Sequence, residues 1–487
     1  GRFRALETIR EYGIERLADA GELVRARVTQ AEFLGARARE MDRLLRGPRI
    51  MEALSWFDDE EDNIASALRY SSAVPLASVT IALVVSCAWY WLIRDRNEEA
   101  RDWLDIASPL AVGVEGDEAR ILSLVQPLML GARADGAAEL SGMSEELTRS
   151  MTQLLAPLSQ LKLGPGSHEL LQLIVPTLQA FGAVMGEPDW MTRVRLPSPE
   201  ALGLDPWPTA VMHVARAAMA QNRGDVDELG SESRLAREIF TQIGDLWGLA
   251  LSEQMYSLWF ATTGQLTEAL EMGDSATEHM RQITSRWDLA QQQGLGIQML
   301  FRLGRADEAR GRIEQMLRDA EAGGNARTIL QAQLIAATAD VELGDLASAG
   351  TRLAAIDELR DQWHNGPGQL VALVEVVKGS IARRRGDLGG AENHLREAVA
   401  AAIRSHDSPV IGAVALSVAT WALVSGKVAV AVRAVNLSTA LIGYYDASHP
   451  EIESVVTAAD AAKIERPSTR VPERPISPEA LTALLSA

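Results

Sequence analysis

Six glycines recur at nearly constant spacing in the second half of the chain, and this spacing constrains the fold more than any other feature. Successive glycines are 40, 40, 40, 42 and 40 residues apart, at Gly224, Gly264, Gly304, Gly344, Gly386 and Gly426. Glycine adopts the left-handed backbone conformation that commonly ends an α-helix, without the steric cost that a side chain would add. The spacing therefore predicts a tandem repeat in which a helix ends at each glycine.

Small residues recur at fixed distances from these glycines. Seven residues before each glycine come Ala217, Ser257, Ile297, Ala337, Gly379 and Ala419, and five residues after come Leu229, Ala269, Ala309, Ala349, Ala391 and Ala431. Small side chains at these positions would let two antiparallel helices of one hairpin approach closely. Further turn signals, such as Gly244-Asp245, fall about 20 residues away, so each repeat is expected to hold two helices of about 15 to 18 residues.

One helical hairpin cannot bury its own apolar face, so neighbouring hairpins are expected to stack. The prediction is an all-α chain built as an α-solenoid, whose curved inner wall is the natural binding surface. Composition agrees, because apolar residues make up 47% and aromatic residues only 5% of a chain rich in alanine and leucine. The alternative is a globule of irregular helical hairpins.

The charge of the chain argues against nucleic acid as a partner of this part of the protein. The formal net charge is −19, whereas nucleic-acid binding relies on basic side chains that neutralise phosphates. The single cysteine, Cys87, excludes an intramolecular disulfide and fits a reducing, cytoplasmic compartment. The chain begins at Gly1 without a methionine, which suggests a cut inside a longer protein.

Two local features could indicate either a special function or ordinary helix structure. The run 70–93 has no charged residue and is long enough to cross a membrane, but its serines, Pro75 and the polar continuation 94–97 favour a buried helix. The acidic cluster 58–63 could suggest metal binding, but consecutive carboxylates point around a helix rather than to one site. We therefore expect no membrane span, and a solvated helix face at the cluster.

The sequence contains no motif that carries known catalytic chemistry. The seven histidines show no metal-ligand spacing, and neither a His-Glu-x-x-His helix nor a Gly-x-Ser-x-Gly turn occurs. The phosphate-binding Gly-x₄-Gly-Lys-Ser/Thr motif is also missing, since Gly426-Lys427 is followed by Val428. We therefore predict no enzymatic activity, no catalytic residue, no metal site and no cofactor in this chain.

Several stretches resemble one class of bacterial regulator. Near the start these are RFRALETIREYGIERLADAGE, LLRGPRIMEALSWFDDEEDNIASAL and AWYWLIRDRNEEARDWLDIASPLA. Later come DPWPTAVMHVARAAMAQNRGDVDE, IGDLWGLALSEQMYSLWFATTGQLTEAL, SHPEIE and PISPEALTALL. Together they resemble the TPR-like C-terminal sensor region of STAND-class transcriptional regulators with an NB-ARC-type ATPase, of the AfsR/SARP-like or large LuxR (MalT-like) type. The resemblance implies that ATPase and DNA-binding modules precede this chain in the same protein.

The resemblance and the repeat register together suggest four regions. Residues 1–20 would be the remnant of a winged-helix element, beginning with a short strand, and residues 21–205 would form irregular helical repeats. Residues 206–445 would form six TPR-like repeats, and residues 446–487 a C-terminal cap in which Ser477 caps a short helix. Within the irregular region, Gly186 lies 38 residues before Gly224 and suggests one degenerate repeat.

The inner wall of the solenoid can be estimated by aligning the turn glycines with the TPR pattern. That alignment predicts a ligand- or peptide-binding surface made of Gln254, Gln291, Gln298, Arg302, Gln331, Thr338, Glu342, Arg383 and Arg384. Amide and guanidinium groups offer several donors and acceptors to a peptide backbone or a small polar ligand. Some of these residues could instead be ordinary solvent-facing ones, and residues 113–206 remain a second place where a ligand could bind. Tryptophans at 207, 247 and 287 also repeat every 40 residues, which we interpret as packing between hairpins.

The functional hypothesis is a non-enzymatic sensor arm that binds a protein, a peptide or a small-molecule signal. By binding one conformational state better than another, the signal would shift a switch in the missing ATPase module. The alternative is a structural TPR scaffold that assembles partner proteins and has no switching role.

Overall fold

The computed structural model describes residues 7–94, 96–133, 163, 165–184, 193–283, 286–323, 326–360, 368–405, 407–471 and 480–485. The chain is 84% helical, and none of these described residues lies in a strand. It is an α-solenoid of TPR-like helix-turn-helix repeats, so the predicted fold class is confirmed. The chain divides into two compact units, Gly1–Met129 and Leu130–Ala487. The boundaries predicted at residues 20, 205 and 445 remain predictions.

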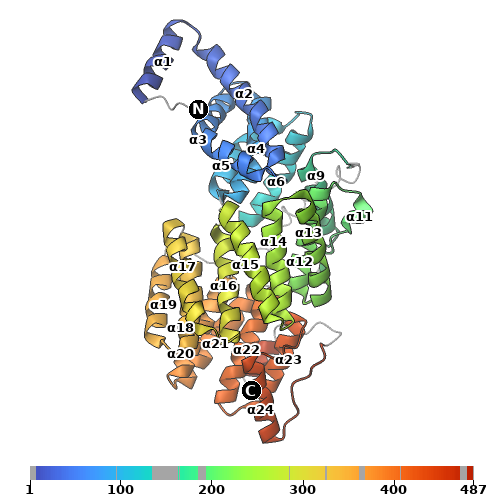
Figure 1. Cartoon of the computed structure of the whole chain (residues 1–487), viewed down its shortest axis with the longest axis vertical. Coiled ribbons are helices and arrows are strands. Elements are labelled where there is room, and N and C mark those ends of the chain that lie inside the picture. Colours follow the sequence, from blue (N-terminus) through green and yellow to red (C-terminus); the bar gives the residue numbers. More distant parts are fainter. Residues whose placement is uncertain are drawn as a thin grey trace. The chain divides into compact units, whose positions relative to one another are not determined.

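The first unit is built of helices, labelled in Figure 1, of which one is 24 residues long. They are α1 (Glu7–Asp19), α2 (Leu23–Leu44), α3 (Ile50–Ala73), α4 (Ala77–Ile93), α5 (Asn97–Ala107), the 3₁₀ turn η1 (Ser108–Ala111) and the start of α6 (Asp117–Arg133). Residues 1–6, on which the predicted N-terminal strand rests, lie outside the described part of the chain.

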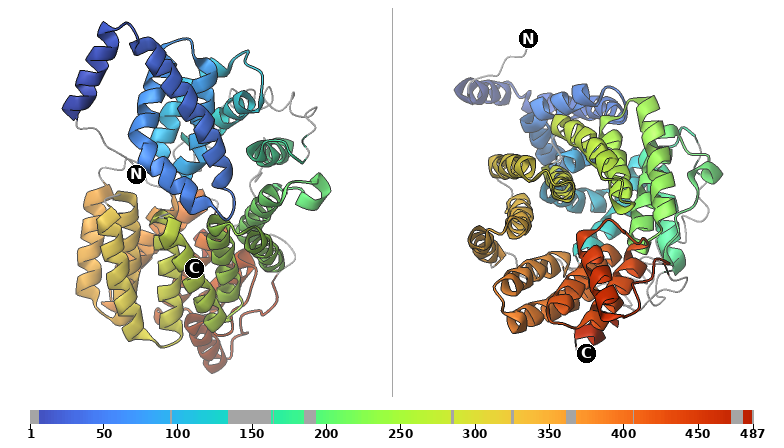
Figure 2. Two further views of the ribbon diagram at one scale, coloured as in Figure 1. Left: turned by 45° about the horizontal axis from the view of Figure 1, so that its top comes forward. Right: turned by 60° about the horizontal axis from the view of Figure 1, so that its bottom comes forward.

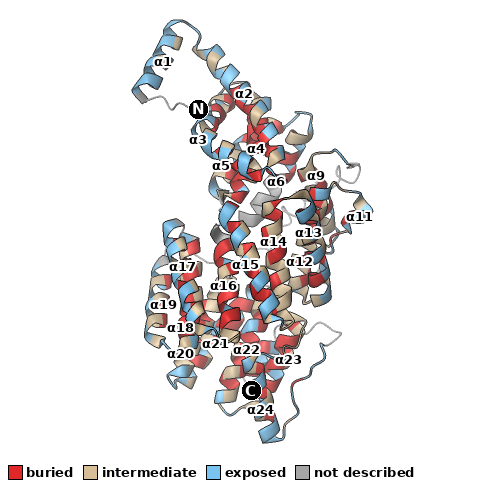
Figure 3. Cartoon of the chain, viewed as in Figure 1, coloured by how far each residue is buried: buried red, intermediate tan, exposed pale blue. Residues whose placement is uncertain are grey.

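The uncharged run 70–93 forms a buried helix of the first unit rather than a membrane span. Residues 70–73 of this run end α3, and its remainder from residue 77 is α4, which packs against α2, α3 and α5 and is buried along most of its length (Figure 3). Among the described helices, none has both the length and the apolar character that a membrane crossing requires. Cys87 is buried in this helix, and burial raises the pKa of its thiol, so it acts as a small core residue.

The acidic cluster 58–63 is exposed but also joins helices. Asp58 of α3 accepts a hydrogen bond from the Tyr90 hydroxyl at 3.0 Å and forms an ion pair with Arg94. Glu61 accepts a hydrogen bond from Arg96 at 2.7 Å. The predicted solvated face is therefore only part of its role, because two of its carboxylates tie α3 to the end of α4 and to the residue before α5.

The second unit is dominated by six helical hairpins. After α9 (Glu169–Val184) and the single turn α11 (Pro199–Leu202), the first helices of the hairpins are α12 (Pro206–Arg223), α14 (Leu246–Thr262), α16 (Arg286–Arg302), α18 (Ala326–Leu343), α20 (Gly368–Arg384) and α22 (Ser408–Val424). The second helices are α13 (Val226–Ile243), α15 (Leu266–Ile283), α17 (Ala306–Gly323), α19 (Leu346–Arg360), α21 (Leu388–Ser405) and α23 (Val428–Ile442).

Each of the six glycines lies in the turn within a hairpin, as the spacing predicts. Their φ angles range from 72° to 82°, the left-handed region that ends the first helix of each pair. The small residues that follow them face the partner helix, and Ala309, Ala349, Ala391 and Ala431 are fully buried. Asp225 lies directly after its glycine and caps the second helix of its hairpin by accepting a hydrogen bond from the Glu228 backbone N–H at 3.0 Å.

Two of the three periodic tryptophans pack between hairpins. The rings of Trp207 and Trp247 lie 6.3 Å apart, and Trp207 Nε1 donates to a carboxylate oxygen of Asp245 at 3.1 Å. The structural interpretation is confirmed for this pair, while the side chain of Trp287 lies outside the described residues. Gly186 and Ser477 lie outside them as well, so the degenerate repeat and the predicted cap residue stay predictions.

The six hairpins close into a ring. Each first helix contacts the first helix of the next hairpin, from α12 through α14, α16, α18 and α20 to α22, and α12 in turn contacts α22 and α23. In the right panel of Figure 2 the red C-terminal helices come back beside the green helices around residue 210. Helix α24 (Pro450–Ala462) packs on α22 and α23, and α25 (Ala480–Leu485) on α21 and α23.

Candidate functional site

The nine predicted wall residues all lie on first helices, those of the second to fifth hairpins. Gln254 is on α14, Gln291, Gln298 and Arg302 are on α16, Gln331, Thr338 and Glu342 are on α18, and Arg383 and Arg384 are on α20. Gln291 and Gln298 are exposed, and Gln254 and Gln331 are half-buried. The first helices form the ring, so these residues share one layer of the molecule.

Four of the nine gather at one end of this layer, where the first helices have their C-termini. Arg384 and Glu342 form an ion pair across neighbouring helices, with Nη2 and Oε2 3.3 Å apart. Arg383 precedes Arg384 in the last turn of α20, and Arg302 is the last residue of α16. The structure therefore groups the charged members of the predicted set.

The other five members do not form a cluster with one another. The Thr338 hydroxyl donates to the Leu334 carbonyl of its own helix at 2.9 Å. Within the described part of the chain, the amides of Gln254, Gln291, Gln298 and Gln331 make no side-chain hydrogen bond. They line their helices as separate polar groups.

A segment that was predicted mostly as part of the C-terminal cap, and not of the binding wall, crosses the same end of the ring. We call residues 443–451, between α23 and the first turn of α24, the crossing segment. Its Tyr444 hydroxyl donates to the carbonyl of Thr263, directly after α14, at 3.3 Å. Its Asp446 forms an ion pair with Arg302, and Arg302 Nη2 also donates to the Ser448 hydroxyl at 3.0 Å.

The crossing segment begins with a very close backbone contact. Gly443 has a φ of 80° and ends α23, and a Cβ placed on it would lie 1.6 Å from the carbonyl oxygen of Gly224. Gly224 follows α12, so this contact joins the last hairpin to the first. Only glycine permits two backbones to approach this closely. In the sequence, only Gly443 itself, a glycine outside the 40-residue register, hints at this contact. It does not identify Gly224 as the residue that it contacts.

Glu451, at the end of the crossing segment, has an unusual environment. Burial raises the pKa of its carboxyl to about 7; the Thr420 hydroxyl, Arg383 and Arg384 lower it, and Glu342 raises it. Burial also lowers the pKa of Arg383, with Arg384 contributing in the same direction and Glu451 opposing it. These shifts place Glu451 in the electrostatic field of Arg383 and Arg384, two of the predicted wall residues.

We define the mouth of the ring as Gly224, Thr263, Arg302, Glu342, Arg383, Arg384 and Thr420, at or near the C-terminal ends of the six first helices. Arg383 is half-buried, and among the described residues no side chain forms a direct ion pair or hydrogen bond with it. Guanidinium groups held this way can bind carboxylate or phosphate groups. The chemistry of the mouth is therefore that of anion recognition.

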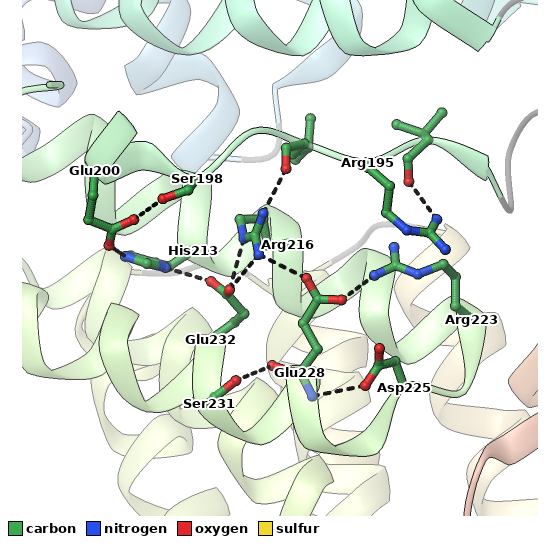
Figure 4. A network of polar contacts seen from close by, with 12 residues as sticks. Arg195, Ser198, Glu200, His213, Arg216, Arg223, Asp225, Glu228, Ser231 and Glu232 are labelled. Carbon is green, nitrogen blue, oxygen red and sulfur yellow. Dashed lines mark hydrogen bonds and ion pairs between the residues drawn. The ribbon is translucent and has the colours of Figure 1, made fainter. Parts of the chain in front are cut away.

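A second polar cluster lies at the first hairpin and is shown in Figure 4. His213 of α12 has Nδ1 2.6 Å from a carboxylate oxygen of Glu232 and Nε2 3.1 Å from one of Glu200. Arg216 donates to Glu232 at 2.8 Å and to the Leu196 carbonyl at 2.6 Å. The imidazole is only 3% exposed.

This second cluster holds structure together rather than presenting reactive groups. It fastens the extended residues 194–198 and the turn α11 to the hairpin of α12 and α13 (Figure 4). Hydrogen bonds from His213 and Arg216 offset the effect of burial and lower the pKa of Glu232, so its carboxylate remains charged in the interior. A buried charge that is paired on both sides stabilises a local arrangement, and removing one partner would be costly.

One solved structure of a known protein, a Rap protein, agrees with the fold of this chain. Neither a protein-family model nor a curated protein matches the sequence. A Rap protein solved in complex with Competence and Sporulation Factor is 12% identical, with a TM-score of 0.51 over 79% of this chain and 92% of that one. RapI in its apo form is 11% identical, with a TM-score of 0.49 over 75% of this chain and 97% of that one. A STAND protein with a tetratricopeptide repeat sensor from Pyrococcus horikoshii is 13% identical, with a TM-score of 0.37 over 78% of this chain and 51% of that one.

Proposed function

We propose that this chain is a non-enzymatic binding module, the TPR-like sensor arm of a STAND-type ATPase transcriptional regulator. It receives a peptide, protein or small-molecule signal on the wall that runs from Gln254 to Arg384. ATPase and DNA-binding modules on its N-terminal side, in the same cytoplasmic protein, convert the signal into a transcriptional response. Neither nucleic acid nor a membrane is a partner of this part of the protein.

The observation that carries the proposal is the mouth of the ring. Its arginines lie in a chain whose formal net charge is −19, so they are a local exception to the overall field. Arg383 is half-buried without a direct carboxylate partner among the described residues, although a buried cation normally requires one. A ligand that carries an anionic group would supply the missing partner. The Rap protein that shares this fold was solved with a bound factor, which is in keeping with this use of the fold.

The alternative is a TPR scaffold that assembles partner proteins without switching. The sequence upstream of Gly1 separates the two functions. A phosphate-binding motif followed by a winged helix supports the sensor, and their absence supports the scaffold. In either case we expect isothermal titration of this chain with Mg-ATP to show no binding. Stoichiometric binding would contradict the proposal that ATP binds only to the module on the N-terminal side.

Charge reversal at the mouth tests the binding wall directly. Replacing Arg383→Glu together with Arg384→Glu should lower the response of the full-length regulator at a reporter promoter by about tenfold or more, since a lost charged contact costs about 1.5 to 3 kcal/mol. Circular dichroism should show unchanged helical content.

The matched control for this charge reversal is Arg404→Glu with Arg433→Glu, two exposed arginines on α21 and α23. It makes the same change in net charge away from the mouth, and the response should stay at the parent level. An undiminished response in the Arg383/Arg384 variant would show that the signal binds elsewhere, and residues 113–206 would be the next region to test.

A further inference from the structure

The crossing segment has the features of a ligand bound at the mouth. It consists of the non-helical residues 443–449 between α23 and α24 and of the first two residues of α24, and its two carboxylates are five residues apart. Asp446 pairs with Arg302, and each side chain of this pair is only 15% exposed. Glu451 lies in the field of Arg383 and Arg384, and Tyr444 donates to the partly buried carbonyl of Thr263. The segment thus uses the charged residues that the sequence analysis assigned to a ligand.

The mouth would carry an excess of positive charge without this segment. Three arginines would remain with a single carboxylate, that of Glu342, and Glu342 is paired with Arg384. Arg302 would lose both Asp446 and the Ser448 hydroxyl, while Arg383 has no direct partner among the described residues even with the segment in place. Such a surface favours a replacement that also carries carboxylates.

The docking of the crossing segment is imperfect, so another occupant could replace it. The carboxyl of Glu451 is held where burial disfavours its charged form, and Glu342 adds repulsion. His449 is also disfavoured as a cation, because burial lowers its pKa and Arg302 adds to the effect, against the opposing influence of Asp446. A peptide whose carboxylates reach Arg302 and Arg383 directly would not carry these costs.

We propose that the mouth of the ring is a docking site for an extended acidic segment of a protein partner, and that residues 443–451 occupy it as an internal stand-in. This inference rests on the proposed binding function and specifies its ligand class and its regulation. The partner must displace the crossing segment, and the closure of the ring between the first and last hairpins therefore opposes binding.

The test uses a fluorescein-labelled synthetic peptide with the sequence of residues 443–453, GYYDASHPEIE, and the full chain. In the variant Gly443→Ala the added methyl group would lie 1.6 Å from the Gly224 carbonyl oxygen, so the crossing segment has to leave the mouth. Fluorescence anisotropy should show that this variant binds the peptide at least about tenfold more tightly than the parent chain does.

Gly304→Ala is the matched control. Gly304 has a positive φ of 74°, like Gly443, but a Cβ there has no neighbour within 4 Å. It shares the backbone strain without displacing the crossing segment, so its peptide affinity should equal that of the parent. A peptide with Asn and Gln in place of its two carboxylates that reach the mouth should bind Gly443→Ala about tenfold more weakly, and so should the parent peptide after Arg302→Gln and Arg383→Gln are added.

Each outcome decides the proposal. If Gly443→Ala is as helical as Gly304→Ala but does not bind the peptide, or binds the neutral peptide equally well, the docking site is refuted. If Gly443→Ala loses helix, the variant Asp446→Asn with Ser448→Ala takes its place, because it removes the two contacts of the crossing segment with Arg302 without a steric clash, and the same two results apply. ATP binding by the parent chain would overturn the sensor assignment while leaving the peptide result unaffected.

Discussion

At the scale of single residues, the most informative group is the carboxyl of Glu451. Its pKa is raised to about 7 chiefly by burial, with Glu342 acting in the same direction and Thr420, Arg383 and Arg384 opposing it. A carboxyl whose folded-state pKa lies above its unfolded value favours the folded state when protonated. The stability that it contributes is fully present below pH about 4.5 and is lost as the pH rises through about 7.

This shift predicts how Glu451→Gln changes the pH dependence of stability. Above pH 8 the variant should be more stable than the parent by about 1 to 3 kcal/mol, because it no longer buries a charge. Below pH 4.5 the difference should vanish, since both side chains are then neutral. Urea unfolding of the second unit, measured at both pH values, checks the difference.

The matched control for Glu451 is Glu453→Gln, an exposed carboxyl of the same helix. It removes a carboxyl of the same helix that is not buried, so a gain that appears in both variants cannot come from the burial of Glu451. An equal difference at both pH values for Glu451→Gln would mean that burial does not govern this group. The histidine beside it, His449, titrates in the opposite sense and remains in both variants, so it cancels from the comparison.

The sequence predicted Arg302 and Arg383 as wall residues but not what they contact. Both stand in the last turn of a first helix, and periodicity alone places them there. Asp446, the partner of Arg302, is 144 residues away along the chain. Such a contact depends on the rotations between all the intervening hairpins, which add up along the chain. No local sequence pattern predicts their total.

At the scale of helices and turns, the sequence is a reliable guide, because the chemistry that ends a helix is local. The spacing of the six glycines predicted each hairpin turn, and all six glycines have the left-handed conformation. The pairing inside the hairpins was less visible. His213 with Glu232, and Glu375 with His394 at 2.7 Å, occupy the same two repeat positions with acid and base exchanged. The two repeats share an acid–histidine pair but not the residue type at either position. A comparison of residue types between repeats of one sequence therefore does not detect it.

Two of the turn glycines should respond differently to the same substitution. Gly304→Ala should destabilise the second unit by about 1 kcal/mol, from backbone strain alone, because nothing lies within 4 Å of the added atom. Gly224→Ala should cost about 2 to 4 kcal/mol, since its Cβ would also lie 2.9 Å from the Leu441 carbonyl oxygen and 3.0 Å from the Gly443 nitrogen. The midpoints of urea unfolding at constant slope measure both losses in the free energy of unfolding. Equal losses would show that the backbone at the contact between the first and last hairpins moves to accommodate the added methyl group without an energetic cost.

At the scale of the whole second unit, the closed ring is what the repeat pattern does not predict. An open solenoid places each hairpin in contact with its neighbours only, and its stability is a sum of local terms. Closure adds an interface between hairpins at the two ends, made here by α12 with α22 and α23 and by the crossing segment with Gly224, Thr263 and Arg302. The first hairpin therefore depends on residues near the C-terminus, far along the sequence.

That dependence gives the last prediction, which concerns hydrogen exchange. In Gly443→Ala the backbone amides of α12 should exchange about tenfold faster than in the parent, which corresponds to about 1.4 kcal/mol of lost local stability. Those of α17, in the third hairpin, should not change, because α17 contacts α16 and α18 and takes no part in the closure. Gly304→Ala should show the reverse, with faster exchange at the turn between α16 and α17 and normal protection in α12. If α12 keeps its protection in Gly443→Ala while the variant is otherwise folded, the ends of the ring are not energetically coupled, and the mouth is open to a ligand without any displacement of the crossing segment.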